Sequence, residues 1–276
     1  MAKPIITFPA IKRGEVILRA RGITVGFGDT LVLENLDIDL KAGEVLGVVG
    51  ASGTGKSVLL RSIVGLLPRR AGTVEVYGLN YDSSDRGVRE AVDRRWGVLF
   101  QNGALFSALT VKQNVQLPMR EHLDLPEDLM DELARIKIEM VGLRPDAAEK
   151  YPSELSGGMI KRASLARALA LDPDIVFLDE PTSGLDPISA AEFDDLLKKL
   201  CTTLALSAFM VTHDLDSLYA ACDRIAVIGN KKVMVEGGLP DMLAFDDPWV
   251  QDYFRGKRAR RLNDALTEDG MLPVEA

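Results

Sequence analysis

Cysteine is almost missing from this sequence. Cys201 and Cys222 are its only two cysteines in 276 residues. Small secreted scaffolds that depend on disulfides are rich in cysteine, whereas a single pair in a chain of this length is typical of reduced thiols with no framework role. A disulfide-stapled fold is therefore excluded.

Long hydrophobic runs are missing as well. No apolar run approaches the roughly 18 residues needed to cross a bilayer, and the N-terminal segment Met1–Pro4 has no secretory h-region. We expect a cytosolic protein whose contact with a membrane, if it has one, comes through a partner.

The sequence also lacks a surplus of positive charge. Lys and Arg together number 33 against 41 Asp and Glu, which gives a net charge of −8. Nucleic-acid backbones are bound by clustered Lys and Arg, so we expect no nucleic-acid partner. The hydrophobic content of 47% and the length allow one large core or two modest ones.

Short apolar runs alternate with helical patterns along the chain. Three continuous runs are typical of strands buried on both faces of a parallel sheet: Val45–Val49, Ile175–Leu178 and Ser207–Val211. Other predicted strands are Val16–Leu18, Thr24–Val25, Leu36–Leu40, Thr73–Tyr77 and Trp96–Phe100, with a hairpin of Ile225–Ile228 and Lys232–Val235 around Gly229-Asn230. Residues from Val111 to about Ala170 are predominantly helical in pattern.

A complete phosphate-binding loop, G-x-x-x-x-G-K-S, follows the first of these apolar runs and opens a helical pattern. Its glycines let successive backbone N–H groups face an anion. Lys56 adds charge for the β- and γ-phosphates of ATP, and Ser57 offers a hydroxyl to Mg²⁺. The predicted ATP-binding residues of the loop are Gly50, Ala51, Ser52, Gly53, Thr54, Gly55, Lys56 and Ser57.

Acidic side chains follow the run at Ile175–Leu178. Asp179 at a strand's carboxyl end is expected to lie beside the phosphate loop and to hold Mg²⁺ through water. Because side chains alternate along a strand, Glu180 is expected to point in a different direction from Asp179. It is a candidate for orienting and deprotonating the attacking water. His213 follows the run expected to form the neighbouring strand, from which it could contact the γ-phosphate. His122 lies in a polar stretch and has no predicted role.

A second anion site is predicted about a hundred residues after the loop. Ser156 is a good N-cap for a helix at Met159–Ala170, and Gly157 and Gly158 leave its first backbone amides bare. One chain cannot easily wrap this site and the phosphate loop around one γ-phosphate. We therefore expect two copies of the chain to pack head to tail around ATP.

Over roughly residues 15–250, this set of motifs resembles that of the ATP-binding-cassette (ABC) ATPases. By that resemblance Phe27 stacks on adenine, Gly50–Ser57 is the Walker A loop and Gln101 is the Q-loop glutamine, a contributor to Mg²⁺ binding and catalysis. Leu155–Met159 is then the signature, Asp179 the Walker B carboxylate, Glu180 the catalytic glutamate, Ser183–Asp186 the D-loop and His213 the switch histidine.

Within that family the chain is most similar to the ATPase subunits of bacterial Mla/Mce-type lipid transporters. The similarity is carried by Met159, where most cassettes have Gln, and by the segments Gln101–Phe106 and Leu117–His122. It implies an ATPase homodimer beneath a membrane permease, with a STAS-domain regulatory subunit and a periplasmic Mce-domain lipid-binding protein. The chain would then be peripheral on the inner face of the inner membrane.

The resemblance also implies an architecture: an α/β P-loop NTPase of the ABC ATPase type. It has a mixed, mostly parallel core sheet, an antiparallel β subdomain and an inserted α-helical subdomain at about residues 103–170. We expect the ATPase domain to span residues 1–255 and a tail to span residues 256–276. The basic cluster at Arg255–Arg261 could be solvated, bind the anionic inner leaflet or cross onto the partner ATPase.

Three other functions stay open at this point. The chain could drive import of amino acids or other small polar solutes, or it could be a soluble ABC protein of translation or DNA repair. It could also be a nucleotide sensor without turnover, although Glu180 and His213 are both present. Kinases and GTPases also have phosphate loops, but they fit poorly because neither class needs the segment Leu155–Met159.

Overall fold

The computed structural model describes residues 8–256 of the chain. This part contains two β-sheets, one mostly parallel and one antiparallel. The larger sheet has the strand order β10-β9-β3-β8-β7-β6, and its neighbouring strands are parallel except β9 and β10. Its strands are β3 (Val45–Val49), β6 (Trp96–Leu99), β7 (Ile175–Asp179), β8 (Ser207–Val211), β9 (Arg224–Gly229) and β10 (Lys232–Gly237). Every residue of β3, β7 and β8 is buried, which explains why uninterrupted apolar runs predicted them.

The smaller sheet is antiparallel, in the order β2-β1-β4-β5. Its strands are β1 (Val16–Phe27), β2 (Thr30–Lys41), β4 (Ala71–Val76) and β5 (Leu79–Asn80). The sequence predicted two short strands where β1 is one strand of 12 residues. Register shifts between Ala20 and Ile23 and between Ile23 and Val25 interrupt its pairing with β2, and such irregularities break the two-residue alternation of side chains.

The hairpin of β9 and β10 was predicted correctly, but its turn was placed one residue too early. Gly229 belongs to β9 and pairs with Lys232. The two turn residues are Asn230 and Lys231, with φ of 49° and 65°. Positive φ at both central residues matches the twist of the flanking strands in a two-residue loop.

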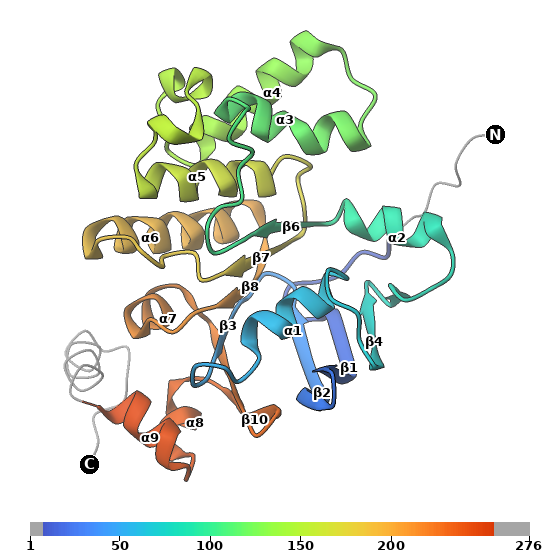
Figure 1. Cartoon of the computed structure of the whole chain (residues 1–276), viewed down its shortest axis with the longest axis vertical. Coiled ribbons are helices and arrows are strands. Elements are labelled where there is room, and N and C mark those ends of the chain that lie inside the picture. The colour runs from blue at the N-terminus through green and yellow to red at the C-terminus, as the bar shows by residue number, and fades with distance from the viewer. Residues whose placement is uncertain (1–7, 257–276) are drawn as a thin grey trace.

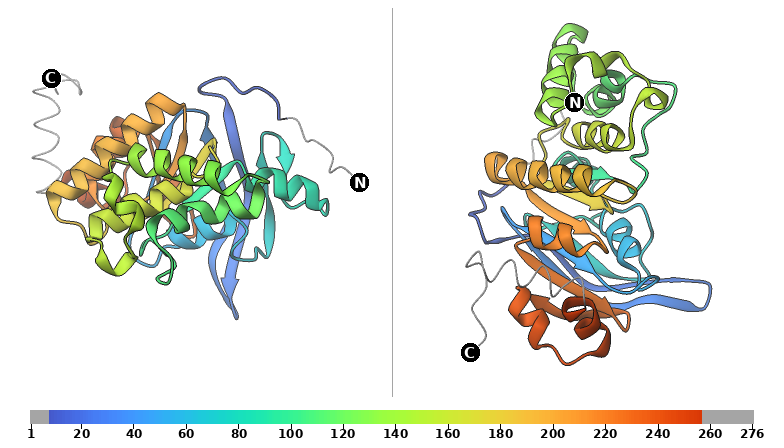
Figure 2. Two further views of the ribbon diagram at one scale, coloured as in Figure 1. Left: turned by 90° about the horizontal axis from the view of Figure 1, so that it is seen from above. Right: turned by 90° about the vertical axis from the view of Figure 1, so that its left-hand side faces the viewer.

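A helical insertion separates β6 from β7. It contains α3 (Val111–His122), α4 (Glu127–Met140), the short 3-10 turns η1 (Pro145–Glu149) and η2 (Pro152–Glu154), and α5 (Gly157–Ala168). Thr110 and Gln113 form a reciprocal capping box that starts α3. Figures 1 and 2 show α3 and α4 gathered at one end of the molecule, away from the strands.

Two hydrophobic cores lie on opposite faces of the larger sheet. Alternate residues of β7 divide between them: Val176 and Leu178 join one core, and Ile175 and Phe177 join the other. The first core includes residues of α5 and α6 (Pro187–Leu204), whereas the second includes residues of α1 (Lys56–Ile63) and of the smaller sheet. Helices α5 and α1 are therefore on opposite sides of the sheet, as Figure 1 also shows.

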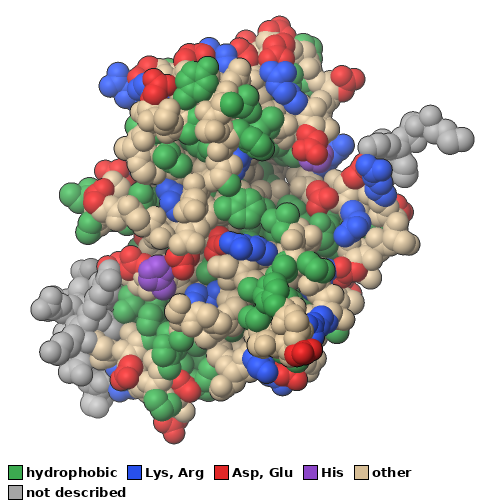
Figure 3. Space-filling view, viewed as in Figure 1, with side chains coloured by type: hydrophobic (Ala, Val, Ile, Leu, Met, Phe, Trp, Pro, Cys, Tyr) green, Lys and Arg blue, Asp and Glu red, His purple; other side chains and the backbone are tan. Residues whose placement is uncertain are grey.

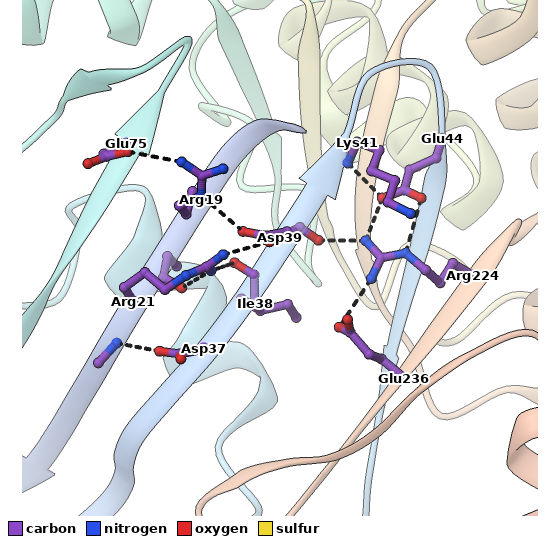
Figure 4. A network of polar contacts seen from close by, with 12 residues as sticks. Arg19, Arg21, Asp37, Ile38, Asp39, Lys41, Glu44, Glu75, Arg224 and Glu236 are labelled. Atoms are coloured by element: carbon purple, nitrogen blue, oxygen red, sulfur yellow. Dashed lines mark hydrogen bonds and ion pairs between the residues drawn. The ribbon is translucent and has the colours of Figure 1, made fainter. Parts of the chain in front are cut away.

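The remaining described helices are α2 (Arg86–Asp93), α7 (Leu215–Ala221), α8 (Leu239–Ala244) and α9 (Pro248–Arg255). A polar network ties the two sheets together (Figure 4). The Arg224 guanidinium donates to the Asp39 carbonyl at 2.6 Å and to Glu44 Oε1 at 2.6 Å. Asp39 in turn accepts from Arg21 at 2.6 Å.

This architecture confirms the predicted fold class: a mostly parallel core sheet, an antiparallel sheet and an inserted helical region. Within residues 8–256, no helix combines the length and hydrophobicity needed to span a membrane. On the face drawn in Figure 3, acidic and basic side chains are intermixed. Arg255 donates to the Leu243 carbonyl at 2.8 Å, and the rest of the basic cluster and the tail from residue 257 lie outside the described residues.

One carboxyl group is buried where α6 packs on α7. Asp194 is 2% exposed and its Oδ1 has no hydrogen-bond partner among the described residues. Burial raises the pKa of Asp194 to about 6, while a hydrogen bond with Ser217 opposes that rise. Ser217 also pairs with Thr182, Oγ to Oγ1 at 3.1 Å. The ionised form of Asp194 is therefore disfavoured in the folded state.

We expect Asp194→Asn to stabilise the protein at pH 8 by about 1–3 kcal/mol. Because the pKa of Asp194 is raised in the folded state, the stability that the neutral carboxyl contributes is complete below about pH 4 and lost as the pH rises through about 6. The gain should therefore shrink toward zero as the pH falls from 8 to 4. Urea unfolding curves at several pH values measure it. Asp252→Asn, which makes the same change at an exposed position on α9, is the control, and an equal gain from both variants would contradict the assignment.

Candidate functional site

The phosphate loop joins β3 to α1. Gly55 precedes α1 with φ of 97° and offers no side-chain cap to its first amides. A Cβ at Gly55 would lie 2.8 Å from Val32 Cγ1 and 2.9 Å from Leu33 Cδ2, so the loop is pressed against β2 at this point. Bare amides at a helix N-terminus attract anions. The predicted phosphate site thus has the backbone that its chemistry requires.

Lys56 is folded over the same loop. Its Nζ donates to the carbonyl of Gly50 at 2.8 Å and to that of Ala51 at 3.0 Å. Burial lowers the pKa of the Lys56 ammonium, and the carboxylates of Glu180 and Asp179 oppose that shift. A phosphate arriving at the loop would replace these carbonyls with a stronger, charge-assisted acceptor.

Ser57, the last residue of the loop, is hydrogen-bonded to Asp179. Ser57 Oγ donates to Asp179 Oδ1 at 2.6 Å, and Arg61 pairs with the other carboxylate oxygen at 3.3 Å. Asp179 is completely buried at the end of β7. A hydroxyl and a carboxylate are hard oxygen donors of the kind that Mg²⁺ takes, with its other positions left to phosphate and water. These two residues fit a Mg²⁺ site shared with the nucleotide. Among the described residues no cluster of three or more acidic, His or Cys side chains offers an all-protein site.

Glu180, Gln101 and His213 form a cluster at the carboxyl ends of neighbouring strands. Gln101 Nε2 donates to Glu180 Oε2 at 3.1 Å, and His213 Nδ1 lies 3.1 Å from Glu180 Oε1. The β7–β8 pairing that brings them together is the one expected from the sequence. Glu180 has φ of 50°, an uncommon conformation for a residue with a side chain, of the kind found at functional sites. Their proposed catalytic roles stay predictions.

Phe27 ends β1 and is 54% exposed. An exposed aromatic ring is available to stack on a base. The β1–β2 hairpin that carries Phe27 is the same one whose Val32 and Leu33 press on Gly55. The structure therefore places Phe27 on the hairpin beside the phosphate loop, and its contact with adenine stays a prediction.

The predicted second anion site is the start of α5. Ser156 is the N-cap, as expected, and its Oγ accepts from the Met159 amide at 3.3 Å. The helix begins at Gly157, two residues before the predicted start. Ser156 and Gly157 are exposed, whereas Met159 packs against the core beneath.

The two anion sites of one chain do not face each other. The phosphate loop continues into α1, which packs on one face of the larger sheet, and Ser156–Gly158 begins α5, which packs on the other face. The structure thus brings together the predicted loop, Asp179, Glu180, Gln101 and His213 as one site. It does not bring Ser156–Gly158 to that site in the same chain.

One residue of the site was missed in the sequence analysis. Lys161 is 5% exposed, and its Nζ donates to the backbone carbonyls of Gln101 and Glu180, the latter at 3.0 Å. Burial lowers the pKa of Lys161 to about 8, against the opposing effect of the Glu180 and Asp179 carboxylates. The available signal was its spacing, because Lys161 falls on the same helix face as the buried Leu165 and Ala168.

Comparisons with known proteins identify the family of the chain. The family model described as ABC transporter matches residues 33–183. The chain is 38% identical to the intermembrane phospholipid transport system ATP-binding protein MlaF of Haemophilus influenzae, over 87% of this chain and 91% of that protein. It is 37% identical to the probable ribonucleotide transport ATP-binding protein mkl of Mycobacterium leprae, over 88% of this chain and 70% of that protein.

Solved structures give the same result at the level of the fold. A dimeric structure of MJ0796, described as a bacterial ABC transporter cassette, superposes with a TM-score of 0.72 at 29% identity, covering 80% of this chain and 97% of that one. A second dimeric MJ0796 structure, of a post-hydrolysis state bound to ADP and Pi, matches equally, with a TM-score of 0.72, 29% identity and the same coverage.

Proposed function

The chain belongs to the ABC transporter family, and from this premise we propose that it powers phospholipid transport between bacterial membranes as the ATPase subunit of a membrane complex. ATPase activity follows from family membership. The similarity to MlaF along nearly the whole length of both chains supports the lipid cargo. The observation that carries the chemistry is the Glu180–Gln101–His213 cluster beside the phosphate loop.

The working unit that we propose is a homodimer. Because the loop and the α5 N-terminus lie on opposite faces of one sheet, each ATP would be held by the loop of one copy and by Ser156–Gly158 of the other. The dimeric cassette structures that resemble this chain support this arrangement.

In this arrangement each group has a defined task. Lys56 and the loop amides bind the β- and γ-phosphates, and Phe27 covers the base. Ser57 and Asp179 would hold Mg²⁺, which supplies charge neutralisation at the phosphates when it is bound. Glu180 takes the proton of the attacking water, and its oxygens are oriented by Gln101 and His213. The amides of Gly157 and Gly158 complete the positive surround of the γ-phosphate from the other chain.

We place the chain at the cytoplasmic face of the inner membrane, held there by a permease. A STAS-domain regulatory subunit and a periplasmic Mce-domain lipid-binding protein would complete the assembly. Gln101 leads from the site into the helical insertion, so a change at the γ-phosphate could move that insertion against the permease.

Purifying the native assembly through a tag on this chain tests the cargo. We expect it to carry a permease and extractable phospholipid well above the amount retained by an unrelated inner-membrane transporter purified in the same way. A second candidate, transport of a small polar solute, is favoured by the similarity to the ribonucleotide-transport relative. ATPase stimulation by ribonucleotide in an assembly that retains only the control level of lipid would favour that candidate and contradict ours.

A further inference from the structure

The helix that starts at Ser156 also reaches the catalytic cluster of its own chain. Lys161 lies on α5, five residues after that N-cap, and is buried with its ammonium between two backbone carbonyls. One belongs to Gln101 and the other, at 3.0 Å, to Glu180. A buried cation of this kind is retained only where its hydrogen bonds offset its desolvation.

A second cation on α5 holds the next part of the same loop. Arg167 Nη2 donates to the Gly103 carbonyl at 2.8 Å, and Nη1 donates to the Ala104 carbonyl at 2.6 Å. Gly103 sits so close to the helix that an added Cβ would be 2.6 Å from Ser164 Oγ. Both Gly103 and Ala104 have positive φ. The loop that begins at Gln101 is therefore bound to α5 at three carbonyls.

Glu180 is fixed from two directions. Its amide donates to the Val211 carbonyl at 2.8 Å, which ties it to the end of β8. Its carbonyl accepts from Lys161 and from the Ser183 amide at 3.2 Å. These bonds hold the residue in its left-handed conformation, with φ of 50°, against the steric cost of about 1 kcal/mol or more that a side chain brings there.

We propose that Lys161 is a positioning residue that links the two ATP sites of the dimer. The hydrogen bonds from its ammonium to two backbone carbonyls make α5, the Gln101 loop and the Glu180 backbone move as one body. A nucleotide bound by the partner and seated on Ser156–Gly158 would then fix the position of Glu180 at the chain's own nucleotide. This inference rests on the proposed dimer.

The link acts through geometry and not through contact with ATP. A shift of a catalytic group by a fraction of an ångström lowers the rate of a chemical step while leaving substrate binding nearly unchanged. We therefore expect Lys161→Met, which keeps the length of the side chain but removes its donors, to lower kcat about 10-fold with KM changed less than about 2-fold. Lys161→Arg keeps a charged donor and should restore kcat to within about 3-fold of the original.

The experiment measures kcat, KM and the Hill coefficient for ATP in the Met, Arg and Gln variants of Lys161. The Hill coefficient of the Met variant should fall toward 1, since the sites would no longer be linked. Each variant is also combined with Glu180→Gln, and its mass with Mg-ATP is measured by light scattering. If the Met variant does not fold, Lys161→Gln, which keeps an N–H donor on a shorter side chain, decides the question with an expected kcat decrease of at least about 3-fold.

The outcomes separate the two proposals. Dimers formed with Mg-ATP by the double variant, together with low kcat and rescue by Arg, support the positioning role. Dimers formed normally, with unchanged kcat and Hill coefficient in the folded Met or Gln variant, overturn it and leave the dimer intact. If Glu180→Gln alone forms no dimer with Mg-ATP, the proposed homodimer fails instead.

Discussion

Replacing Glu180 by Gln should lower kcat for ATP hydrolysis by about 10²–10³-fold, the usual cost of removing one well-placed contributor to a transition state. The amide cannot take a proton from water, but it keeps the size of the side chain and its contact with Gln101 at 3.1 Å. Binding of ATP should survive, because Lys56 and the loop amides are unaltered. The variant should therefore accumulate with ATP bound.

Phosphate release at saturating Mg-ATP measures this loss, and equilibrium binding of labelled ATP measures the retained affinity. Glu132→Gln is a matched control, because it makes the same chemical change at an exposed position on α4. Full turnover by the Glu180 variant would remove Glu180 from the role of general base.

The second large effect is expected at Gly158. A Cβ added there would lie 3.9 Å from the nearest atoms of its own chain, the Cβ and Oγ of Ser189. The fold of a single chain therefore has room for a side chain at this position. If the amides at Gly157 and Gly158 face a partner's phosphate, however, Gly158→Asp places a carboxylate against a triphosphate. We expect kcat to fall by at least about 10²-fold with ATP binding by the phosphate loop retained.

Thermal unfolding and ATP titration of Gly158→Asp establish that its fold and its own nucleotide site are intact. Ala205→Asp adds the same charge at the exposed C-terminal end of α6, where φ of 54° suits Asp, and should hydrolyse ATP at the original rate. Normal turnover by Gly158→Asp would mean that the start of α5 contacts no nucleotide.

The parts of the fold that followed from the sequence are those governed by local pattern and motif. The buried strands around the phosphate loop were predicted because every residue of β3, β7 and β8 is apolar or small enough to be buried, up to the terminal Asp179. The N-cap at Ser156 was predicted from its residue type. The long strand β1 was predicted in pieces, because its register shifts near Ile23 disrupt the alternation that a sequence reveals.

The residues of the site also fall into two groups, those that the sequence could place and those that it could not. Asp179, Glu180 and His213 could be placed together, because the carboxyl ends of parallel neighbours share one edge of a sheet. The left-handed backbone of Glu180 could not be predicted, since it is imposed by the hydrogen bond that its amide donates to Val211 and the one that its carbonyl accepts from Lys161. Lys161 itself was missed because its acceptors lie 60 and 19 residues away in the sequence, and the acceptors are backbone carbonyls, which carry no residue signature.

The central claim is that ATP is held across two copies of the chain, and the mass of the Glu180→Gln protein in solution tests it most directly. Light scattering should report the mass of one chain without nucleotide and of two chains with Mg-ATP. Adding Gly158→Asp to the same protein should keep it at one chain with Mg-ATP, although ATP still binds. Equal dimer formation with and without Gly158→Asp would contradict the account.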